Sequence, residues 1–139
     1  MRGMWEHFQH IADVGVRGIG KTPDEAFAEG AVALMAVMVE PSTVRDATRV
    51  AIFCQADELD ILFADWLNAL IYEMEVRNVL FGRFEVHIDG TRLTGSAWGE
   101  RFDAARHSIS VGVKAATYME LRVYQRGDRL WTAQCVVDV

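Results

Sequence analysis

Two aspartates near opposite ends of the sequence each border a strand-like apolar run. Asp13 comes just before VGVRGIG, with His10 three residues ahead of it, and Asp138 directly follows WTAQCVV. If the last strand pairs near the first, the two aspartates meet, and neighbouring carboxylates must bind a proton or share a cation. The pattern indicates a hard-metal site, since Ca²⁺ and Mg²⁺ prefer oxygen ligands. The alternative is that Asp13 is a turn-forming or solvated aspartate and that His10 is packed or hydrogen-bonded.

Two further polar groups lie between these ends. The segment GERFDAARH places Glu100 and His107 on a predicted loop or short helix, which forms either a solvated charge cluster or a binding face. Lys114 lies in SVGVKAATYMEL, residues 110–121, whose small and β-branched residues predict a strand. A lysine there either snorkels at the strand edge or, flanked by alanines, leaves room for a partner to approach.

The familiar catalytic motifs are absent from the sequence. It contains no GxSxG, no phosphate-binding glycine loop before a helix, no HExxH and no metal-type pairing of cysteine with histidine. We therefore expect no enzyme activity of its own. Cys54 and Cys135, far apart inside apolar runs, are predicted to be small buried hydrophobic residues.

Composition argues against a nucleic-acid partner and against a membrane location. Fourteen basic against twenty acidic residues give a net charge of −6, the wrong sign for a protein that grips nucleic acid through its phosphates. The longest apolar run, residues 30–39, is only ten residues, against the about 20 that cross a bilayer. The first residues have no signal-peptide core. We expect a cytoplasmic protein without a membrane segment and without strong direct binding to nucleic acid.

Two helices are predicted to hold these residues in place. Thr22 is an N-cap candidate followed by a proline at the first helical position, and Pro41 can end the helix that begins there. Asp57 is the candidate cap of the second helix. That helix has one apolar face, expected to be core, formed by Leu59, Leu62, Phe63, Trp66, Leu67, Leu70, Ile71 and Met74.

The remaining elements are predicted to be strands. Residues 5–8, 14–19 and 49–56 are strand-like, and period-two patterns around Asp89-Gly90 and Arg126-Gly127-Asp128 predict two hairpins. A chain of 139 residues suits one domain spanning residues 1–139. The expected fold class is α+β, with two helices packed on antiparallel β-sheets.

Several motifs, in this order and at compatible spacing, resemble the archease family from about residue 5 to residue 139. The motifs are EHFQHIADVGVRGIGKTPDEAFAEGAVALMAVM, DILFADWLNALIYEMEV, GERFDAARH, VKAATYMEL and VVDV. The resemblance implies an α+β sandwich. It also implies an accessory role: archeases promote guanylylation and repeated turnover of the RtcB-type RNA ligase in tRNA splicing and RNA repair.

The resemblance also assigns candidate residues. The HTAD aspartate of the family falls on Asp13 and its C-terminal aspartate on Asp138, which together imply a divalent-metal site for Ca²⁺ or Mg²⁺. The other matching polar positions, as partner-facing candidates, are His10, Glu100, His107, Lys114, Thr117 and Tyr118.

The chain departs from the family pattern at four positions. Ile11 replaces the motif threonine, Gln9 a frequent acid and Met119 a frequent histidine. Lys21 stands where many members have an aspartate that commonly supplies a third carboxylate. The Lys21 ammonium could then lie between Asp13 and Asp138 in place of a metal ion.

Two rival functions accompany the ligase-activator hypothesis. One is a small metal-dependent hydrolase that uses Asp13 and Asp138 with His10 as base, although no nucleophile is evident. The other is a chaperone-like module for an RNA-modifying enzyme such as a tRNA methyltransferase.

Overall fold

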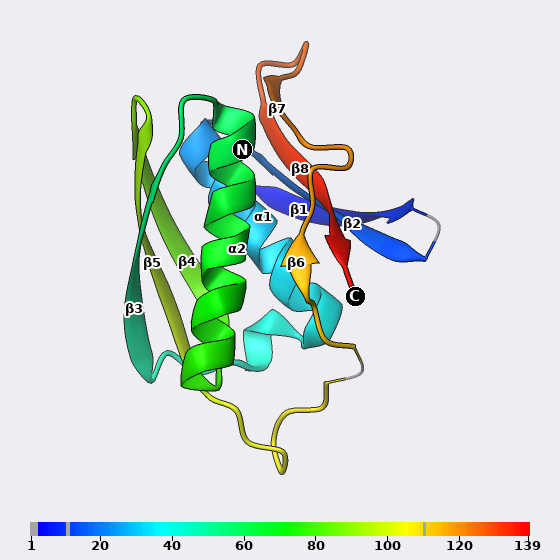
Figure 1. Ribbon diagram of the computed structural model, residues 1–139, viewed down its shortest axis with the longest axis vertical. Coiled ribbons are helices and arrows are strands. Elements are labelled where there is room, and N and C mark those ends of the chain that lie inside the picture. Colours follow the sequence, from blue (N-terminus) through cyan, green and yellow to red (C-terminus); the bar gives the residue numbers. More distant parts are fainter. Residues whose placement is uncertain (1–2, 11, 110) are drawn as a thin grey trace.

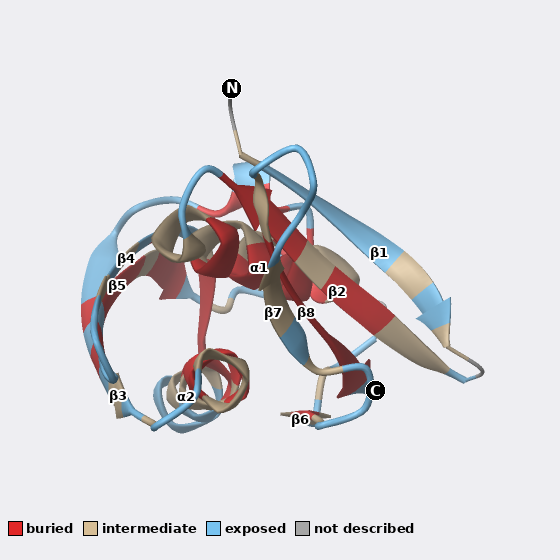
Figure 2. Cartoon of the chain, turned by 90° about the horizontal axis from the view of Figure 1, so that it is seen from above, coloured by how far each residue is buried: buried red, intermediate tan, exposed pale blue. Residues whose placement is uncertain are grey.

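The computed structural model describes residues 3–10, 12–109 and 111–139. Two antiparallel sheets face each other, with two helices packed between and along them (Figure 1). The buried face of helix α1 (Pro23–Met38) contacts both sheets, so most of its circumference is apolar. Seen from above, α1 lies between the sheets and helix α2 (Leu59–Arg77) lies along one open side (Figure 2). The predicted α+β fold is confirmed.

The larger sheet has five strands: β1 (Met4–His10), β2 (Asp13–Gly20), β6 (Ala115–Ala116), β7 (Arg122–Gln125) and β8 (Trp131–Asp138). β1 and β2 form a hairpin, β8 pairs with the other side of β2, and β6 and β7 both pair with the far side of β8. The last strand therefore lies beside the first hairpin, as expected from the sequence.

The strand predicted over residues 110–121 is wrong in most of its length. Within residues 111–121, only β6 pairs with another strand. β8 ends at Asp138, whose carbonyl accepts the Lys114 N–H at 2.8 Å, so residues before Lys114 have no strand left to pair with. After β6, the chain bulges outward, and Glu120 has a positive φ of 55°.

The smaller sheet has the order β3 (Thr48–Gln55), β5 (Arg92–Arg101), β4 (Val79–Asp89). β4 and β5 form the predicted hairpin at Asp89-Gly90, where Gly90 supplies the positive φ of 63° that the turn requires. Strand β3 is the free edge of this sheet. β7 and β8 form the second predicted hairpin in the larger sheet.

The two helices begin differently. Thr22 caps α1 as predicted, because its hydroxyl accepts the Glu25 N–H at 3.1 Å. The predicted Asp57 cap of α2 is wrong: the N-cap is Glu58, and its side chain makes no capping hydrogen bond. Between the helices, a short 3₁₀ turn, η1 (Pro41–Thr43), follows the end of α1.

The backbones of helix α1 and strand β2 are in direct contact at Gly18. A Cβ placed on Gly18 would lie 2.0 Å from the Ala26 carbonyl oxygen and 2.2 Å from the Gly30 nitrogen. The core continues into α2, where the buried Trp66 donates its Nε1–H to the Phe27 carbonyl at 3.0 Å.

Side chains of the helices cap exposed sheet edges. Asn68 accepts the Ala116 N–H at 2.9 Å and donates to the Ala116 carbonyl at 3.1 Å, so it closes the outer edge of β6. Asp60 accepts the Val123 N–H of β7 at 2.7 Å, and Asp24 accepts the Ile88 N–H of β4 at 2.8 Å. Three edge strands are thereby bonded to helix side chains.

Candidate functional site

The pairing of β2 with β8 brings the two terminal aspartates together. Val14 pairs with Val137, so the register places Asp13 opposite Asp138 one step further on, and His10 pairs with Asp13 across the β1–β2 hairpin. Residues directly opposite in an antiparallel pair point to the same face, with Cβ atoms about 5 Å apart. We call His10, Asp13 and Asp138 the sheet-end cluster; these residues stand at the end of β1, the start of β2 and the end of β8.

The members of the sheet-end cluster differ in exposure. Asp138 is exposed, whereas Asp13 and His10 are half-buried. The His10 Nδ1 atom is buried and has no hydrogen-bond partner among the described residues. The cluster therefore offers two carboxylates and one unsatisfied ring nitrogen on one face of the sheet.

Lys114 joins the sheet end through its backbone. Its N–H donates to the Asp138 carbonyl at 2.8 Å, and the next residue, Ala115, pairs with Asp138. The Lys114 side chain is exposed and lines a cavity of about 610 Å³. Phe102, Ile109 and residues of α2 and β4 also line this cavity. Lys114 thus links the cluster to this largely apolar cavity.

Thr117 and Tyr118 follow β6. The Thr117 hydroxyl and N–H both donate to the Val136 carbonyl, at 2.8 and 3.0 Å, so Thr117 fastens the chain to β8. Tyr118 is 64% exposed. Of the two candidates, only Tyr118 has an exposed side chain.

The structure contradicts the predicted position of Lys21. β2 runs from Asp13 to Gly20, and Lys21 follows it at the opposite end. Eight strand residues span about 27 Å at about 3.4 Å each. The Lys21 ammonium therefore cannot lie between Asp13 and Asp138, and an aspartate at position 21 would not reach the pair either. Ile11 lies outside the described residues.

The sheet-end cluster is a poor fit to a closed metal site. Within residues 3–10, 12–109 and 111–139, no group of three or more His, Cys, Asp or Glu side chains is placed to hold one metal ion. Ca²⁺ takes six to eight oxygen ligands, so two carboxylates would leave most of its shell to water. Binding of Ca²⁺ or Mg²⁺ at Asp13 and Asp138 stays a prediction.

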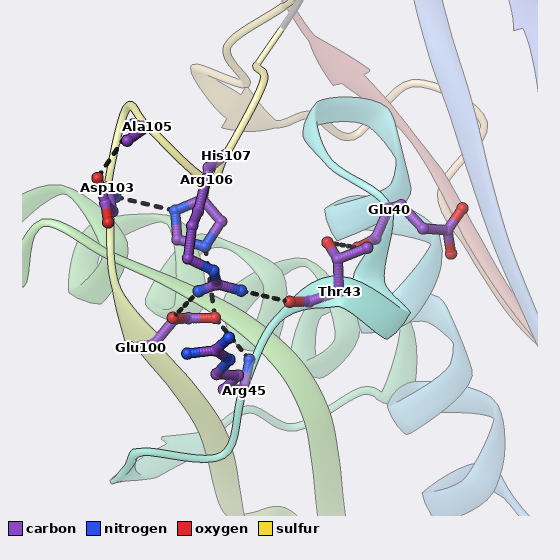
Figure 3. Close-up of polar contacts among 8 residues, drawn as sticks. All are labelled: Glu40, Thr43, Arg45, Glu100, Asp103, Ala105, Arg106 and His107. Atoms are coloured by element: carbon purple, nitrogen blue, oxygen red, sulfur yellow. Dashed lines mark hydrogen bonds and ion pairs between the residues drawn. The ribbon is translucent and has the colours of Figure 1, made fainter.

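Glu100 and His107 form a separate, buried cluster (Figure 3). Both residues are almost fully buried, at 9% and 4% exposure, so the expectation of a solvated charge cluster is wrong for these two, although Asp103 and Arg106 of the same segment are exposed. Glu100 lies in β5 and not on a loop or short helix. Glu100 Oε2 accepts the Arg45 N–H at 2.7 Å, and Oε1 accepts from Arg106 Nη1. Arg106 also donates to the Thr43 carbonyl at 3.0 Å. The cluster ties the loop after β5 to the segment after α1.

The bonds of His107 define its neutral tautomer. Nδ1 accepts the Asp103 N–H at 2.8 Å, so a neutral ring carries its proton on Nε2. Nε2 lies 3.4 Å from Glu100 Oε2 without hydrogen-bond geometry. Phe102 stacks on the ring at 5.8 Å between centroids. His107 is therefore held as part of the core of the loop.

Acidification is expected to destabilise the fold through Glu100. The Arg45 N–H is the largest cause that lowers the pKa of Glu100 below its ordinary 4.5; burial opposes this, and His107 and Arg106 add to the lowering. Such a carboxylate stabilises the fold above its unfolded pKa, and this contribution is lost as pH falls through the lower folded pKa. In urea titrations over the acid range, Glu100→Gln should lower stability at neutral pH and flatten its decline below the unfolded pKa.

The exposed Glu85 provides the control for this titration. Glu85→Gln should keep the acid decline of the unmodified protein. Parallel curves for the unmodified protein and Glu100→Gln would show that Glu100 does not contribute to acid sensitivity.

The sequence analysis did not identify Asn68, whose side chain bonds to the backbone beside Lys114. Asn68 fixes both backbone groups of Ala116, two residues from Lys114. The sequence does contain a signal for it. Asn68 follows Leu67 on a strongly apolar helix, and a half-buried asparagine needs hydrogen-bond partners.

The two cysteines behave as packed apolar residues. Burial raises the pKa of the Cys135 thiol to about 12. Burial, and then the nearby Asp65 carboxylate, raise that of Cys54 to about 11. Cys135 is fully buried and Cys54 partly buried. Both thiols therefore stay protonated and unreactive near neutral pH.

No helix within the described residues is long and apolar enough to cross a membrane.

Comparison with known proteins gives consistent matches over nearly the whole chain. The model of the archease protein family matches residues 5–139. A protein archease from Pyrococcus furiosus is 37% identical over 139 residues, covering 97% of this chain and 98% of the relative. A protein archease from Sulfurisphaera tokodaii is 35% identical over 137 residues, with the same two coverages.

Two solved structures share the fold. The solution structure of Methanobacterium thermoautotrophicum protein 1598 has a TM-score of 0.85 and 29% identity, covering 97% of this chain and 98% of that one. A crystal structure from Thermotoga maritima, described as an archease and possible chaperone, has a TM-score of 0.63 and 20% identity. It covers 100% of this chain and 98% of the other.

Proposed function

The chain belongs to the archease family, and from this premise we propose that it activates an RtcB-type RNA ligase. The activation consists of faster guanylylation of the ligase and repeated turnover, in tRNA splicing or RNA repair. The protein acts in the cytoplasm as an accessory partner and performs no catalysis itself.

The observation that carries this proposal is the sheet-end cluster. Pairing of β2 with β8 sets Asp13 opposite Asp138, with His10 beside them. Lys114 is bonded through its backbone to the same end of the sheet, and Tyr118 is exposed after β6. These five residues belong to the polar positions that match the family, whereas Glu100 and His107 lie in the separate buried cluster.

Net charge supports a ligase as the direct partner. The chain carries −6, and an enzyme that handles RNA needs a basic surface. Opposite charges on two partners speed their encounter and favour one orientation. The exposed Asp138 would be part of the acidic surface that faces the ligase.

The protein alone is expected to show neither nucleotidyl transfer nor RNA joining. The sequence contains no motif that combines a nucleophile with a base and a phosphate-binding group. The two thiols are held protonated by their raised pKa values. Incubation of the purified protein with labelled GTP should leave it unlabelled. Stable labelling in the absence of any ligase would contradict this assignment.

The deciding experiment uses the cognate RtcB-type ligase at limiting concentration. Without this protein, product should stop near one RNA join per ligase; with it, product should accumulate over many turnovers. Guanylylation of the ligase should also be faster. An unchanged product yield and guanylylation rate at saturating protein would refute ligase activation.

A chaperone-like role is the second candidate. The Thermotoga maritima relative is described as a possible chaperone. Exposed apolar side chains at Ile109, Val111, Tyr118 and Met119 flank Lys114 along the chain, and such groups can bind unfolded or aggregation-prone surfaces. Suppressed aggregation of a tRNA methyltransferase, with no effect on the ligase, would favour this role.

A further inference from the structure

In the part of the chain that the structure describes, the outer edge of β3, in the smaller sheet, has unpaired backbone groups. Strand β3 pairs with β5 on one side only. The Ala56 N–H bonds to the Thr91 carbonyl at 3.0 Å, and hydrogen-bonded pairs alternate along an antiparallel ladder. Arg49, Ala51 and Phe53 therefore point their N–H and C=O groups away from β5.

Within the described residues, no side chain bonds to those outward groups of β3, whereas helix side chains bond to β4, β6 and β7. The β3 sequence TRVAIFCQ contains no proline or lysine, the residues that commonly protect an edge strand. By contrast, the edge strand β1 carries Glu6, Gln9 and two histidines. β3 is thus an open pairing edge without such protection.

Apolar side chains border this edge on both faces of the sheet. Phe53 projects from the outer face and is 79% exposed. On the inner side, α2 packs against β3. Asp65 of α2 lies near Cys54 of β3 and, after burial, contributes to the raised pKa of the Cys54 thiol. Tyr72 and Val76, 61% and 57% exposed, continue the Asp65 side of the helix at helical spacing. The view from above shows α2 and β3 side by side (Figure 2).

We propose that the β3 edge pairs with β3 of a second copy, forming a two-fold dimer with a continuous six-stranded sheet. Centring the pair on Ala51 satisfies the outward backbone groups of Arg49, Ala51 and Phe53 in both copies. Each exposed Phe53 then lies opposite Arg49 of the second copy. The Arg49 Nε atom donates to Ser96 Oγ at 3.0 Å, and the guanidinium lies 6.0 Å from the Trp98 ring, so its side chain turns from β5 toward the edge to form a cation–π pair with Phe53. The exposed stripes of the two α2 helices, with Tyr72 and Val76, meet across the axis.

Self-pairing is favoured over other occupants because the edge is complementary to itself. The same strand supplies both the exposed aromatic ring and, four residues away, the guanidinium that pairs with it in the opposite copy. An isologous contact of this kind closes at two copies and forms no filament. The inference stands on these contacts alone and does not depend on ligase activation.

The test is sedimentation velocity of the full chain over a range of concentrations. We expect a dimer that dissociates on dilution. Phe53→Lys should weaken it at least about tenfold, by placing a charge where the aromatic contact forms. Met119→Lys, at another exposed apolar residue, should leave it unchanged. A monomer at every concentration, or a dimer equally stable with Phe53→Lys, would overturn the proposal and leave the edge to a strand of another protein.

A cross-linking measurement tests the register. In a Cys54→Ser background, Ala51→Cys should form an intermolecular disulfide on mild oxidation, because the two Cα atoms lie about 5.5 Å apart in a hydrogen-bonded pair. Gln55→Cys should not, since positions 55 lie about 27 Å apart in this register. Equal cross-linking of both variants would refute pairing centred on Ala51.

Discussion

Replacing Asp13 or Asp138 by alanine is expected to abolish activation of the RtcB-type ligase while the fold stays intact. The register of β2 and β8 places these carboxylates opposite each other, so we expect them to act as one unit. Groups that act as a unit are strongly non-additive, and the double variant should be no worse than either single one. The measurement is the guanylylation rate of the ligase with each variant.

Thermal melts separate lost function from lost structure. Substitution of an exposed polar residue usually changes stability by no more than about 0.5 kcal/mol. Asp57→Ala is the matched control, because Asp57 is exposed and does not cap α2. Full activation by Asp138→Ala with an unchanged melt would refute the shared site and leave Asp13 as a strand-edge aspartate.

Gly18→Ala is expected to destabilise the fold strongly. The added Cβ would lie 2.0 Å from the Ala26 carbonyl oxygen and 2.2 Å from the Gly30 nitrogen, both backbone atoms. Neither can move without separating α1 from β2, so we expect a loss of about 3 kcal/mol or more. Urea titration followed by far-UV circular dichroism measures it.

Gly112→Ala provides the matched control, since nothing lies within 4 Å of its added Cβ. This variant should unfold at nearly the urea concentration of the unmodified protein. Equal stability of Gly18→Ala and Gly112→Ala would mean that α1 and β2 separate at little cost.

Local signals in the sequence predicted local structure well. The Thr22-Pro23 pair set the start of α1, and Asp89-Gly90 set the β4–β5 turn, because each depends on a few neighbouring residues. Asp57 failed as a cap since helix boundaries shift by a residue or two when tertiary contacts compete. Here Asp60 in the first turn bonds to Val123 of β7.

Long-range partners explain the remaining errors. Burial of Glu100 depends on the Arg45 N–H, fifty-five residues away, which no spacing pattern in GERFDAARH reveals. Only the family pattern suggested that Lys21 lies near Asp13; the strand that was predicted over residues 14–19 already separates the two, and β2 confirms this separation. By contrast, the meeting of the first hairpin with β8 could be predicted, since apolar runs that end in matching carboxylates suggested a shared edge.

The pairing of β2 with β8 also sets the order in which the molecule can assemble. β2 is translated long before β8, and until β8 emerges, one side of β2 has no strand to pair with. Closing so large a loop carries an entropic cost before any contact compensates for it, which slows folding. Asp13 and Asp138 can therefore meet only after β8 has been synthesised, so a nascent chain that already holds both helices would still lack the complete sheet-end cluster.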